Sequence, residues 1–598
     1  MPKPNKNNVE KPKDFKKTFN KLLKSLKPYY VHIIVITILS ILGTVFTIVG
    51  PKILGNATTE LYNGIVSKIQ GLGGINFTKL HKILLTILIL YIVSAVFNYL
   101  EGIIMANISQ KFAKDLRTKV DKKVNKLPLK YFDKKTHGEV LSLVTNDIDT
   151  ISQNLNRSAT ELITCIVMVI GILVMMFSIN FSMTIVTLVI LPISLVITAL
   201  IANKSQHHFV NQQERLAKVN GKVEEMLGGQ NIIKSFNAEE KMMKDFEEET
   251  DSLCESAWKS NFLSGLMHPI MKLVGNLGYV VVAIMGGIYV IKGKITVGNI
   301  QSFITYTKNF TNPIANLASI MTELQGMMAA TERVFEFLEE KEEEPIKNKI
   351  SLGEVEGNVV FKNVNFGYDE DKIIINDFSL SVSKGKKIAI VGPTGAGKTT
   401  LVKLLMRFYD TNSGDIFIDG VNIKNVDRDE LRKSFGMVLQ DTWLFSGTIM
   451  ENLRYGKLDA TDREVIEAAK LAHVHHFIQT LPDGYNMFLN EDTNNISGGQ
   501  KQLLTIARAI LANPKILILD EATSSVDTRT EILIQKAMDE LMKNRTSFII
   551  AHRLSTIKNA DLILVLNDGD IVEQGTHEEL LKKGGFYSTL YNSQFEEA

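Results

Sequence analysis

The chain has 598 residues, 45% of them hydrophobic, and a formal net charge of only +2. Its length exceeds that of one ordinary domain, and its balanced charge excludes a general nucleic-acid binder, so nucleic acid is not an expected partner. Its two cysteines support neither a disulfide framework nor a metal site. Long apolar runs fill the stretch before residue 330, and short apolar strands alternate with charged helices after about residue 345. This division predicts a membrane part followed by a soluble α/β part.

A Lys-rich arm precedes the first apolar run. Residues 1–27 hold nine Lys against Glu10 and Asp14, and positive charge beside a span favours the cytoplasmic side. Lysines surround an apolar helical face made of Phe15, Phe19, Leu22, Leu23 and Leu26. We predict an amphipathic helix on the inner membrane surface, ended by Pro28, with an ordinary surface helix as the alternative. We expect no cleavable signal peptide.

Membrane spans are predicted where about 20 mostly apolar residues follow one another. The first five predicted spans are strongly apolar and the sixth is more polar. The spans are 30–52, 82–106, 159–179, 181–203, 264–291 and 297–324.

The connections between these spans set the expected topology. Those at 108–158 and 204–263 are long, charged and helix-like, and the first is dense in Lys and Arg. Positive loops stay in the cytoplasm, and an even number of spans then places both termini there too. Local interruptions at 131–138 and 228–230 are expected turning points, where the membrane part would touch the α/β part.

Several polar side chains interrupt the last two spans, where polar groups are costly and therefore candidates for function. Substrate contact and snorkelling or helix–helix bonding are equally good explanations. The polar residues are Lys272, Asn276, Lys308, Asn312, Asn316 and Glu323. Flexible and aromatic neighbours suit apolar ligands or simple packing; they are Met267, Met271, Phe303, Tyr306, Phe310 and Met321.

The α/β part contains a phosphate-binding motif. A strand at 388–391 runs into a loop that matches G-x-x-x-x-G-K-[ST], and a helix follows. Backbone N–H groups of such a loop cradle phosphates, its Lys reaches the β- and γ-phosphates, and its hydroxyl binds Mg²⁺. The predicted contacts are Gly392, Thr394, Gly395, Ala396, Gly397, Lys398, Thr399 and Thr400.

A second apolar strand, 516–519, ends in two carboxylates. We predict that Asp520 holds Mg²⁺ at the carboxyl end of a parallel strand. Glu521 is then the candidate that orients and polarises the attacking water. Incidental surface charge is the alternative, and the accompanying phosphate loop disfavours it.

Between these motifs, Ile496-Ser497-Gly498-Gly499-Gln500 resembles the signature of ATP-binding-cassette (ABC) proteins. Other segments are similar to the family's motifs, in the family's order. The resemblance implies that Tyr368 stacks on adenine, that Gln440 links the nucleotide and its Mg²⁺ to the membrane domain, and that His552 contacts the γ-phosphate. The segment 524–527 resembles the loop that crosses the dimer interface. Residues implied at that interface are Ser497, Gly498, Gly499, Gln500 and Asp527.

The membrane part also resembles that of ABC exporters. Residues 132–147 are similar to the first coupling segment and 233–237 to the second. Six spans ahead of one cassette form an exporter half-transporter, which implies an all-α six-helix transmembrane domain followed by an α/β P-loop domain. The expected boundaries are 1–27 for the tail and interfacial helix, 28–330 for the transmembrane domain, 331–350 for a linker and 351–598 for the ATP-binding cassette.

Cassettes of this family meet head to tail and hold two ATP molecules, so the resemblance implies a second half-transporter. Ser497 and Gly499 would contact the γ-phosphate bound by the partner's lysine. ATP and Mg²⁺ are the implied cofactors, and closure and reopening of the cassettes would drive alternating access.

One segment departs from the family pattern. Many exporter cassettes carry a glycine-rich stretch ending in Gly-Glu-Arg-Gly before the signature, whereas residues 489–495 here read Leu-Asn-Glu-Asp-Thr-Asn-Asn. One competent half beside an altered half is typical of heterodimeric bacterial exporters. We therefore expect a non-identical partner, with a homodimer as the alternative.

The implied function is ATP-driven export of amphipathic or hydrophobic compounds of the multidrug type, across a bacterial inner membrane. The alternatives are a lipid flippase, a peptide exporter, an importer with the exporter fold, and an ATP-gated channel or regulatory protein.

Overall fold

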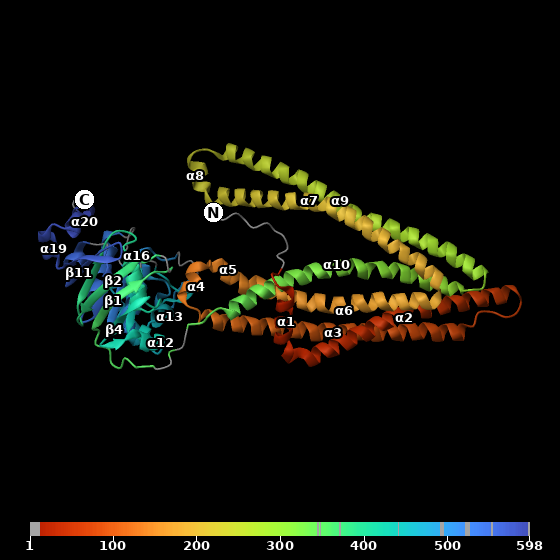
Figure 1. Ribbon diagram of the computed structural model, residues 1–598, viewed down its shortest axis with the longest axis horizontal. Coiled ribbons are helices and arrows are strands. Elements are labelled where there is room, and N and C mark those ends of the chain that lie inside the picture. Colours follow the sequence, from red (N-terminus) through yellow and green to blue (C-terminus); the bar gives the residue numbers. More distant parts are fainter. Residues whose placement is uncertain are drawn as a thin grey trace. The chain divides into compact units, whose positions relative to one another are not determined.

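The computed structural model describes residues 12–343, 346, 349–369, 372–439, 442–490, 495–520, 527–551 and 554–595 (Figure 1). These residues pack into two compact units. The helical unit holds the described residues up to Lys126 together with Lys135–Lys341. The α/β unit holds Leu127–Lys134 together with the described residues from Glu342 onward.

Six long helices form the helical unit within the described residues, and each contains one predicted span. They are α2 (Tyr30–Ile69), α3 (Phe77–Val124), α6 (Ile148–Ile179), α7 (Phe181–Gly228), α9 (Glu239–Ile291) and α10 (Val297–Glu339). Four segments of the described chain are long and apolar enough to cross a membrane: Lys27–Ile69, Phe77–Val124, His137–Ile179 and Lys272–Ile291. The 48 residues of α3 extend about 72 Å at 1.5 Å per residue. This exceeds a hydrocarbon core of about 30 Å, so the helix continues beyond its span, as predicted.

Short helices lie between or before the long ones: α1 (Phe15–Ser25), α4 (Leu129–Lys134), α5 (His137–Ser142) and α8 (Gln230–Ser235). The predicted turn at 228–230 is confirmed, because α7 ends at Gly228 and α8 begins at Gln230. The predicted interruption at 131–138 is confirmed, because the long helix α3 has already ended and the two short helices α4 and α5 meet there, with a break at 135–136. Pro128 disfavours helical backbone in the residue before it, which separates α3 from α4. Thr136 then caps α5 by accepting a hydrogen bond from the Glu139 N–H.

Helices α2 and α10 approach closely at two glycines, as small residues allow between spans. A Cβ at Gly298 would lie 1.6 Å from the Gly55 carbonyl oxygen, so no larger residue fits there. Helices α7 and α9 run side by side and diverge from α2, α3, α6 and α10 over part of their length (Figure 1).

The aromatic residues flagged on the sixth span belong to the core of the helical unit. Phe303, Tyr306 and Phe310 are 0%, 1% and 3% exposed, and they pack with Ile48. The Tyr306 hydroxyl donates a 2.8 Å hydrogen bond to the Ile48 carbonyl. Packing therefore explains these three residues without a ligand.

The α/β unit is built on a six-stranded sheet in the order β12-β11-β3-β10-β9-β6, parallel except for β12. A four-stranded antiparallel sheet, β2-β1-β4-β5, and a separate antiparallel strand pair, β7-β8, accompany it. The strands are β1 (Val359–Phe366), β2 (Ile375–Val382), β3 (Lys387–Val391), β4 (Ser413–Ile418), β5 (Val421–Asn422), β6 (Phe435–Val438), β7 (Gly447–Thr448), β8 (Phe488–Leu489), β9 (Ile516–Asp520), β10 (Thr546–Ile550), β11 (Leu562–Asn567) and β12 (Asp570–Gly575).

Two apolar clusters cover the strands of this unit, one of them centred on the helical layer of α13, α14 and α16. The helices are α11 (Lys398–Leu405), α12 (Arg428–Lys433), α13 (Ile449–Arg454), α14 (Asp462–Leu471), α15 (His475–Thr480), α16 (Gly498–Ala512), α17 (Thr528–Met542), α18 (Leu554–Lys558), α19 (His577–Lys583) and α20 (Phe586–Phe595). In the helical unit, α10 continues to Glu339, inside the range expected as a linker.

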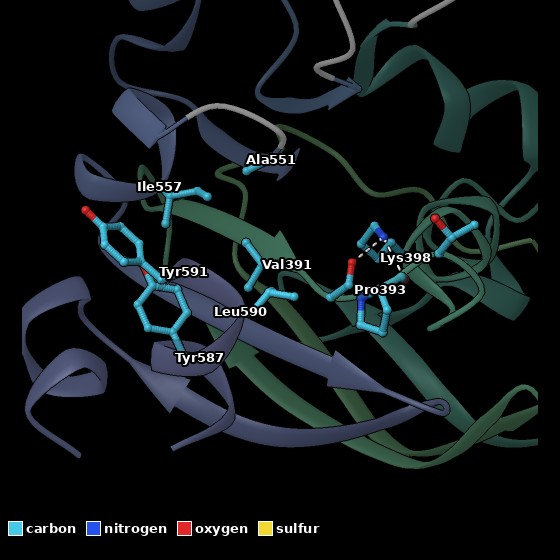
Figure 2. Close-up of a pocket in the computed structure, with 10 residues that line it drawn as sticks. Val391, Pro393, Lys398, Ala551, Ile557, Tyr587, Leu590 and Tyr591 are labelled. Atoms are coloured by element: carbon cyan, nitrogen blue, oxygen red, sulfur yellow. Dashed lines mark hydrogen bonds between the residues drawn. The ribbon is translucent and has the colours of Figure 1, made fainter. Parts of the chain in front are cut away.

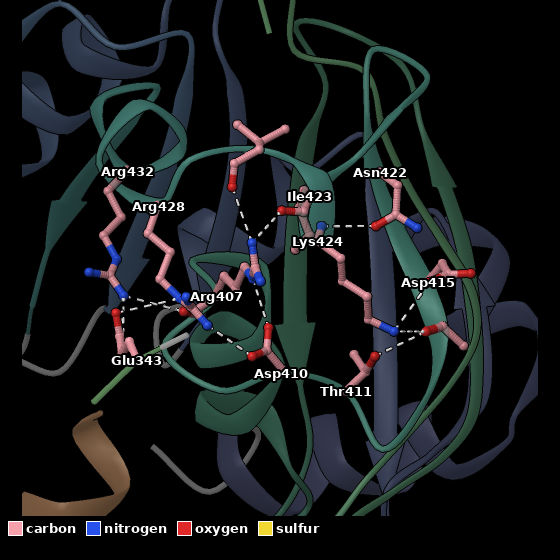
Figure 3. Close-up of polar contacts among 12 residues, drawn as sticks. Glu343, Arg407, Asp410, Thr411, Asp415, Asn422, Ile423, Lys424, Arg428 and Arg432 are labelled. Atoms are coloured by element: carbon pink, nitrogen blue, oxygen red, sulfur yellow. Dashed lines mark hydrogen bonds and ion pairs between the residues drawn. The ribbon is translucent and has the colours of Figure 1, made fainter. Parts of the chain in front are cut away.

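A buried arginine organises the loops after α11 (Figure 3). Arg407 is 7% exposed, and its Nη1 donates to the carbonyls of Ile423 at 2.9 Å and Val426 at 3.1 Å. Its Nε donates to Asp410 at 2.7 Å, and the other Asp410 oxygen accepts from Arg428 at 2.9 Å. One cation therefore satisfies two buried carbonyls and one carboxylate.

Replacing Arg407 by Met is expected to destabilise the α/β unit by about 3 kcal/mol, because it leaves the carbonyls of Ile423 and Val426 buried without their donor. Lys424 provides a matched control: it also binds a carbonyl and a carboxylate, but its side chain is 36% exposed. Lys424→Met is expected to cost at most about 1 kcal/mol. Thermal unfolding of the two full-length variants checks the difference, and equal melting temperatures would contradict it.

Candidate functional site

The glycine-rich loop takes the strand–loop–helix form that the sequence predicts. It links the buried strand β3 to α11 at the carboxyl edge of the six-stranded sheet. Gly397 has a φ of +96°, in the left-handed region that favours glycine. A Cβ at Gly392 would lie 2.2 Å from the Leu566 carbonyl oxygen. Both positions therefore require glycine, and the loop leaves the first N–H groups of α11 available to an anion.

Lys398 folds over this loop (Figure 2). Its Nζ donates to the carbonyls of Gly392 at 2.7 Å and Pro393 at 3.0 Å. Burial lowers the pKa of the Lys398 ammonium, and the nearby charge of Asp520 opposes this effect. The ammonium is thus held beside the loop by neutral acceptors, which phosphate oxygens would replace with stronger, charged ones.

A cavity of about 210 Å³ opens beside the loop (Figure 2). The loop forms one wall through Gly392, Pro393, Thr394 and Lys398, and the carboxyl ends of β3 and β10 contribute Val391 and Ala551. The remaining wall comes from Ile557, Tyr587, Leu590 and Tyr591. The aromatic residues of α20 were not predicted at this site, because only the four-residue spacing of Tyr587 and Tyr591 indicates a common face.

Asp520 is the last residue of β9, and its neighbour across the ladder is Ile550 at the end of β10. Thr399, in the first turn of α11, is exposed. In the described part of the chain no three or more His, Cys, Asp or Glu side chains gather into a metal site. Mg²⁺ at a nucleotide site does not need such a cluster, because it is bound through one or two carboxylates, substrate phosphates and water. One hydroxyl and one carboxylate at this edge fit that requirement.

The predicted adenine-stacking residue lies beside the loop helix. The Tyr368 hydroxyl is 3.3 Å from the Thr400 hydroxyl, and its ring meets the Tyr409 ring edge-on at 5.0 Å. The Lys403 Nζ lies 5.6 Å from the Tyr368 ring centroid and 5.7 Å from that of Tyr409. The structure therefore brings the aromatic residue and the phosphate loop together, as a nucleotide would require.

Lys403 and Tyr409 were not predicted, and both contact the short helix α4. The Tyr409 hydroxyl donates to the Asp133 carboxylate, and the Lys403 Nζ lies 3.8 Å from the same carboxylate. Burial and this carboxylate raise the pKa of Tyr409. Residues 127–134 pack within the α/β unit, so the first three residues of the predicted coupling segment, 132–134, lie in the same unit as the aromatic cluster.

The signature residues begin a long helix, α16. The Ser497 hydroxyl accepts from the Gln500 N–H at 3.4 Å, and the Ser497 N–H donates to the Gln500 side chain at 2.8 Å. This capping box gives both residues a structural role. Beside them, Gly498 is exposed and has open space around it, so a partner's anion can approach the helix N-terminus there.

Asp527 caps α17 by accepting from the Thr530 N–H at 3.0 Å, and this bond lowers the pKa of Asp527. Its predicted contact across a dimer interface stays a prediction. Three catalytic candidates, Gln440, Glu521 and His552, lie outside the described residues, as do residues 491–494 of the altered loop.

Comparisons with known proteins match both parts of the chain. Residues 33–314 match the ABC transporter transmembrane region, and residues 375–524 match the ABC transporter family model. A fatty acid ABC transporter ATP-binding/permease protein of Mycobacterium bovis is 44% identical, with 96% of each chain covered. An ATP-dependent lipid A-core flippase of Syntrophus aciditrophicus is 35% identical, with 87% of each chain covered.

Among solved structures, a bacterial Atm1-family ABC exporter with ATP bound superposes with a TM-score of 0.73. The two proteins are 29% identical, and the match covers 95% of this chain and 98% of the other. The similarity therefore extends over both units rather than over the α/β unit alone.

Proposed function

Because this chain belongs to the ABC transporter family, as an exporter half-transporter with a membrane region ahead of one ATPase cassette, we propose that it exports anionic amphiphiles such as fatty acids. The chain is a multi-pass membrane protein, and its ATPase is coupled to transport. The substrate class lies within the amphipathic compounds expected from the sequence. The relative named for fatty acids supports the choice.

A polar stripe on α10 is the observation that carries this proposal. Lys308, Asn312 and Asn316 are all exposed, and their four-residue spacing places them on one helix face. Lys272 and Asn276 repeat the pattern on α9 and are exposed as well. A cation in a span is costly without a partner, and the carboxylate of an amphiphile would supply one while its chain contacts the apolar helix surfaces.

Glu323 differs from that stripe. Its carboxylate accepts a 2.9 Å hydrogen bond from the Ser158 hydroxyl of α6, which favours a role in helix–helix bonding. Met321 is 47% exposed and remains a candidate for apolar contact. The side chains of Met267 and Met271 lie outside the described part of the chain.

The test measures ATPase stimulation and uptake into inverted vesicles for fatty acids, neutral drugs, peptides and phospholipids. Lys308→Gln is expected to reduce stimulation by fatty acids about ten-fold, since a charged hydrogen bond contributes about 1.5 kcal/mol or more, and to spare neutral drugs. Lys292→Gln, at the exposed C-cap residue that follows α9, is the control. Transport of neutral drugs alone would establish the multidrug alternative. Movement of phospholipid alone would establish a flippase, the function named for the second relative.

The second half of the transporter is proposed to be a non-identical chain. The departure at residues 489–495 supports this, because the signature that follows would face the partner's ATP. In the same proposal Lys398, Glu521 and His552 complete one hydrolysing site, with Mg²⁺ held by Thr399, Asp520 and Gln440. Both termini are proposed to lie in the cytoplasm. Purification of this chain alone as an active, symmetric homodimer would contradict the heterodimer.

A further inference from the structure

Helix α1 has two unlike faces within the helical unit. Thr18, Leu22 and Leu26 are 4%, 2% and 4% exposed, and this face packs against α10. Phe15 and Phe19 are each 41% exposed, and their rings stack with centroids 6.2 Å apart. One face is thus already covered by protein, and a second, apolar face is open.

Carboxylates of α10 hold the covered face in place. Glu332 accepts from the backbone N–H groups of Lys13 at 2.8 Å and Asp14 at 3.2 Å, where a negative charge favours the start of α1. The Lys13 Nζ lies 3.1 Å from Glu336, and the Lys21 Nζ lies 2.6 Å from Glu339. These glutamates occupy one face of α10, so they fix which side of α1 points away.

The open face matches the chemistry of an anionic lipid leaflet. Four exposed lysines border it: Lys16, Lys17, Lys24 and Lys27. The apolar stripe continues onto α2, where Val31 and Ile34 are 73% and 59% exposed. Tyr30 joins the two helices, because its hydroxyl donates to the Leu23 carbonyl at 3.0 Å. Apolar side chains beside lysines bind the acyl boundary and the anionic headgroups together.

The same helix is also too short to be stable alone. Eleven residues fall below the roughly 12 to 15 that an isolated helix needs, and clustered lysines repel one another. Anionic headgroups would offset that repulsion from one side, as the glutamates of α10 do from the other. Two partners that stabilise one helix must strengthen each other's binding.

We propose that α1 is a binding surface for anionic phospholipid of the inner leaflet. Lipid bound there strengthens the packing of α1 against α10. The C-terminal part of α10, which α1 contacts, is also bonded to other helices. Arg333 pairs with Asp147 at 2.6 Å, and the Lys123 Nζ donates to the Glu340 carbonyl at 2.5 Å. Lipid charge would therefore adjust one of the contacts that hold the end of α10.

The experiment places a tryptophan on the open face of the full-length transporter in vesicles. Phe19→Trp is compared with the unsubstituted protein, which has two tryptophans elsewhere. Quenching by a fixed amount of brominated phosphatidylcholine is recorded while phosphatidylglycerol is increased. We expect quenching to rise with phosphatidylglycerol. Adding Lys16→Gln and Lys24→Gln is expected to weaken this dependence about five-fold per lysine.

Glu332→Gln tests the linkage, because Glu332 contacts α1 but lies on α10. It is expected to weaken the dependence on phosphatidylglycerol about three-fold, the effect of losing a helix cap. Glu336→Gln, which keeps the contacts of Glu332 with the start of α1, is expected to act in the same direction. The controls are Lys536→Gln with Lys582→Gln, on the α/β unit, and Glu60→Gln, which removes a 2.7 Å ion pair with Lys79.

Each contrary result overturns a defined part of the proposal. Equal quenching in pure phosphatidylcholine and with phosphatidylglycerol would overturn the selectivity for anionic lipid. The absence of quenching in any vesicle would overturn the lipid surface itself. An unchanged dependence in both glutamate variants would overturn the linkage to α10.

Discussion

A Glu521→Gln variant is expected to bind ATP normally and to lose nearly all ATP turnover. The amide keeps the size of the carboxylate but cannot accept a proton from the attacking water, and a general base contributes about 100- to 10,000-fold to such steps. Phosphate binding depends on the loop at 392–399 instead, so affinity should change little. ATP hydrolysis and equilibrium ATP binding by the purified transporter measure the two effects separately.

The control for that variant is Glu467→Gln, which removes an exposed carboxylate paired with Lys470 at 2.8 Å. It should retain normal turnover. The residual activity of Glu521→Gln also bears on the partner. Residual turnover near one half would indicate a competent second site on another chain, whereas near-complete loss fits a homodimer or a degenerate partner. Full activity would contradict the proposed role of Glu521.

The local elements of the α/β unit were predictable because their signals are local. Alternation of apolar runs and glycines located β3, the loop and α11, and the structure confirms this order. The signature illustrates the limit. Its family resemblance implied nucleotide contact for Ser497 and Gln500, whereas the structure shows that their spacing also builds the cap of α16. The same residues can contact nucleotide and cap the helix, and the sequence pattern does not distinguish these two roles.

Contacts between distant segments were not predictable. Asp133 and Tyr409 are 276 residues apart, and neither has a pattern that points to the other. Similarly, apolar periodicity identified the sixth span but not which of its faces is covered. Phe303, Tyr306 and Phe310 had both ligand and packing explanations until their burial favoured packing. The polar stripe that contains Lys308 is exposed. The same helix therefore has one face that packs in the core and another that is a candidate for substrate contact.

A Lys398→Ala variant is expected to bind ATP about 10- to 100-fold more weakly, because a hydrogen bond from a charged donor contributes about 1.5 to 3 kcal/mol. The ammonium is already held at the loop by the Gly392 and Pro393 carbonyls, so it reaches phosphate without a large rearrangement. Measurement in the Glu521→Gln background prevents hydrolysis from consuming the ligand. The matched control is Lys384→Ala, which loses an exposed ion pair with Glu356 at 3.0 Å.

The pH dependence of ATP affinity separates a phosphate contact from a structural role for Lys398. Burial lowers the pKa of this ammonium in the free protein, whereas phosphate charge beside it would raise the pKa. At alkaline pH the Lys398 amine must therefore take up a proton when ATP binds. ATP affinity should then fall as pH rises through the lowered pKa of Lys398 in the free protein. Lys384→Ala should keep that alkaline decline, and Lys398→Ala should lack it. An unchanged affinity, or an unchanged alkaline decline, in Lys398→Ala would show that the lysine only supports the loop.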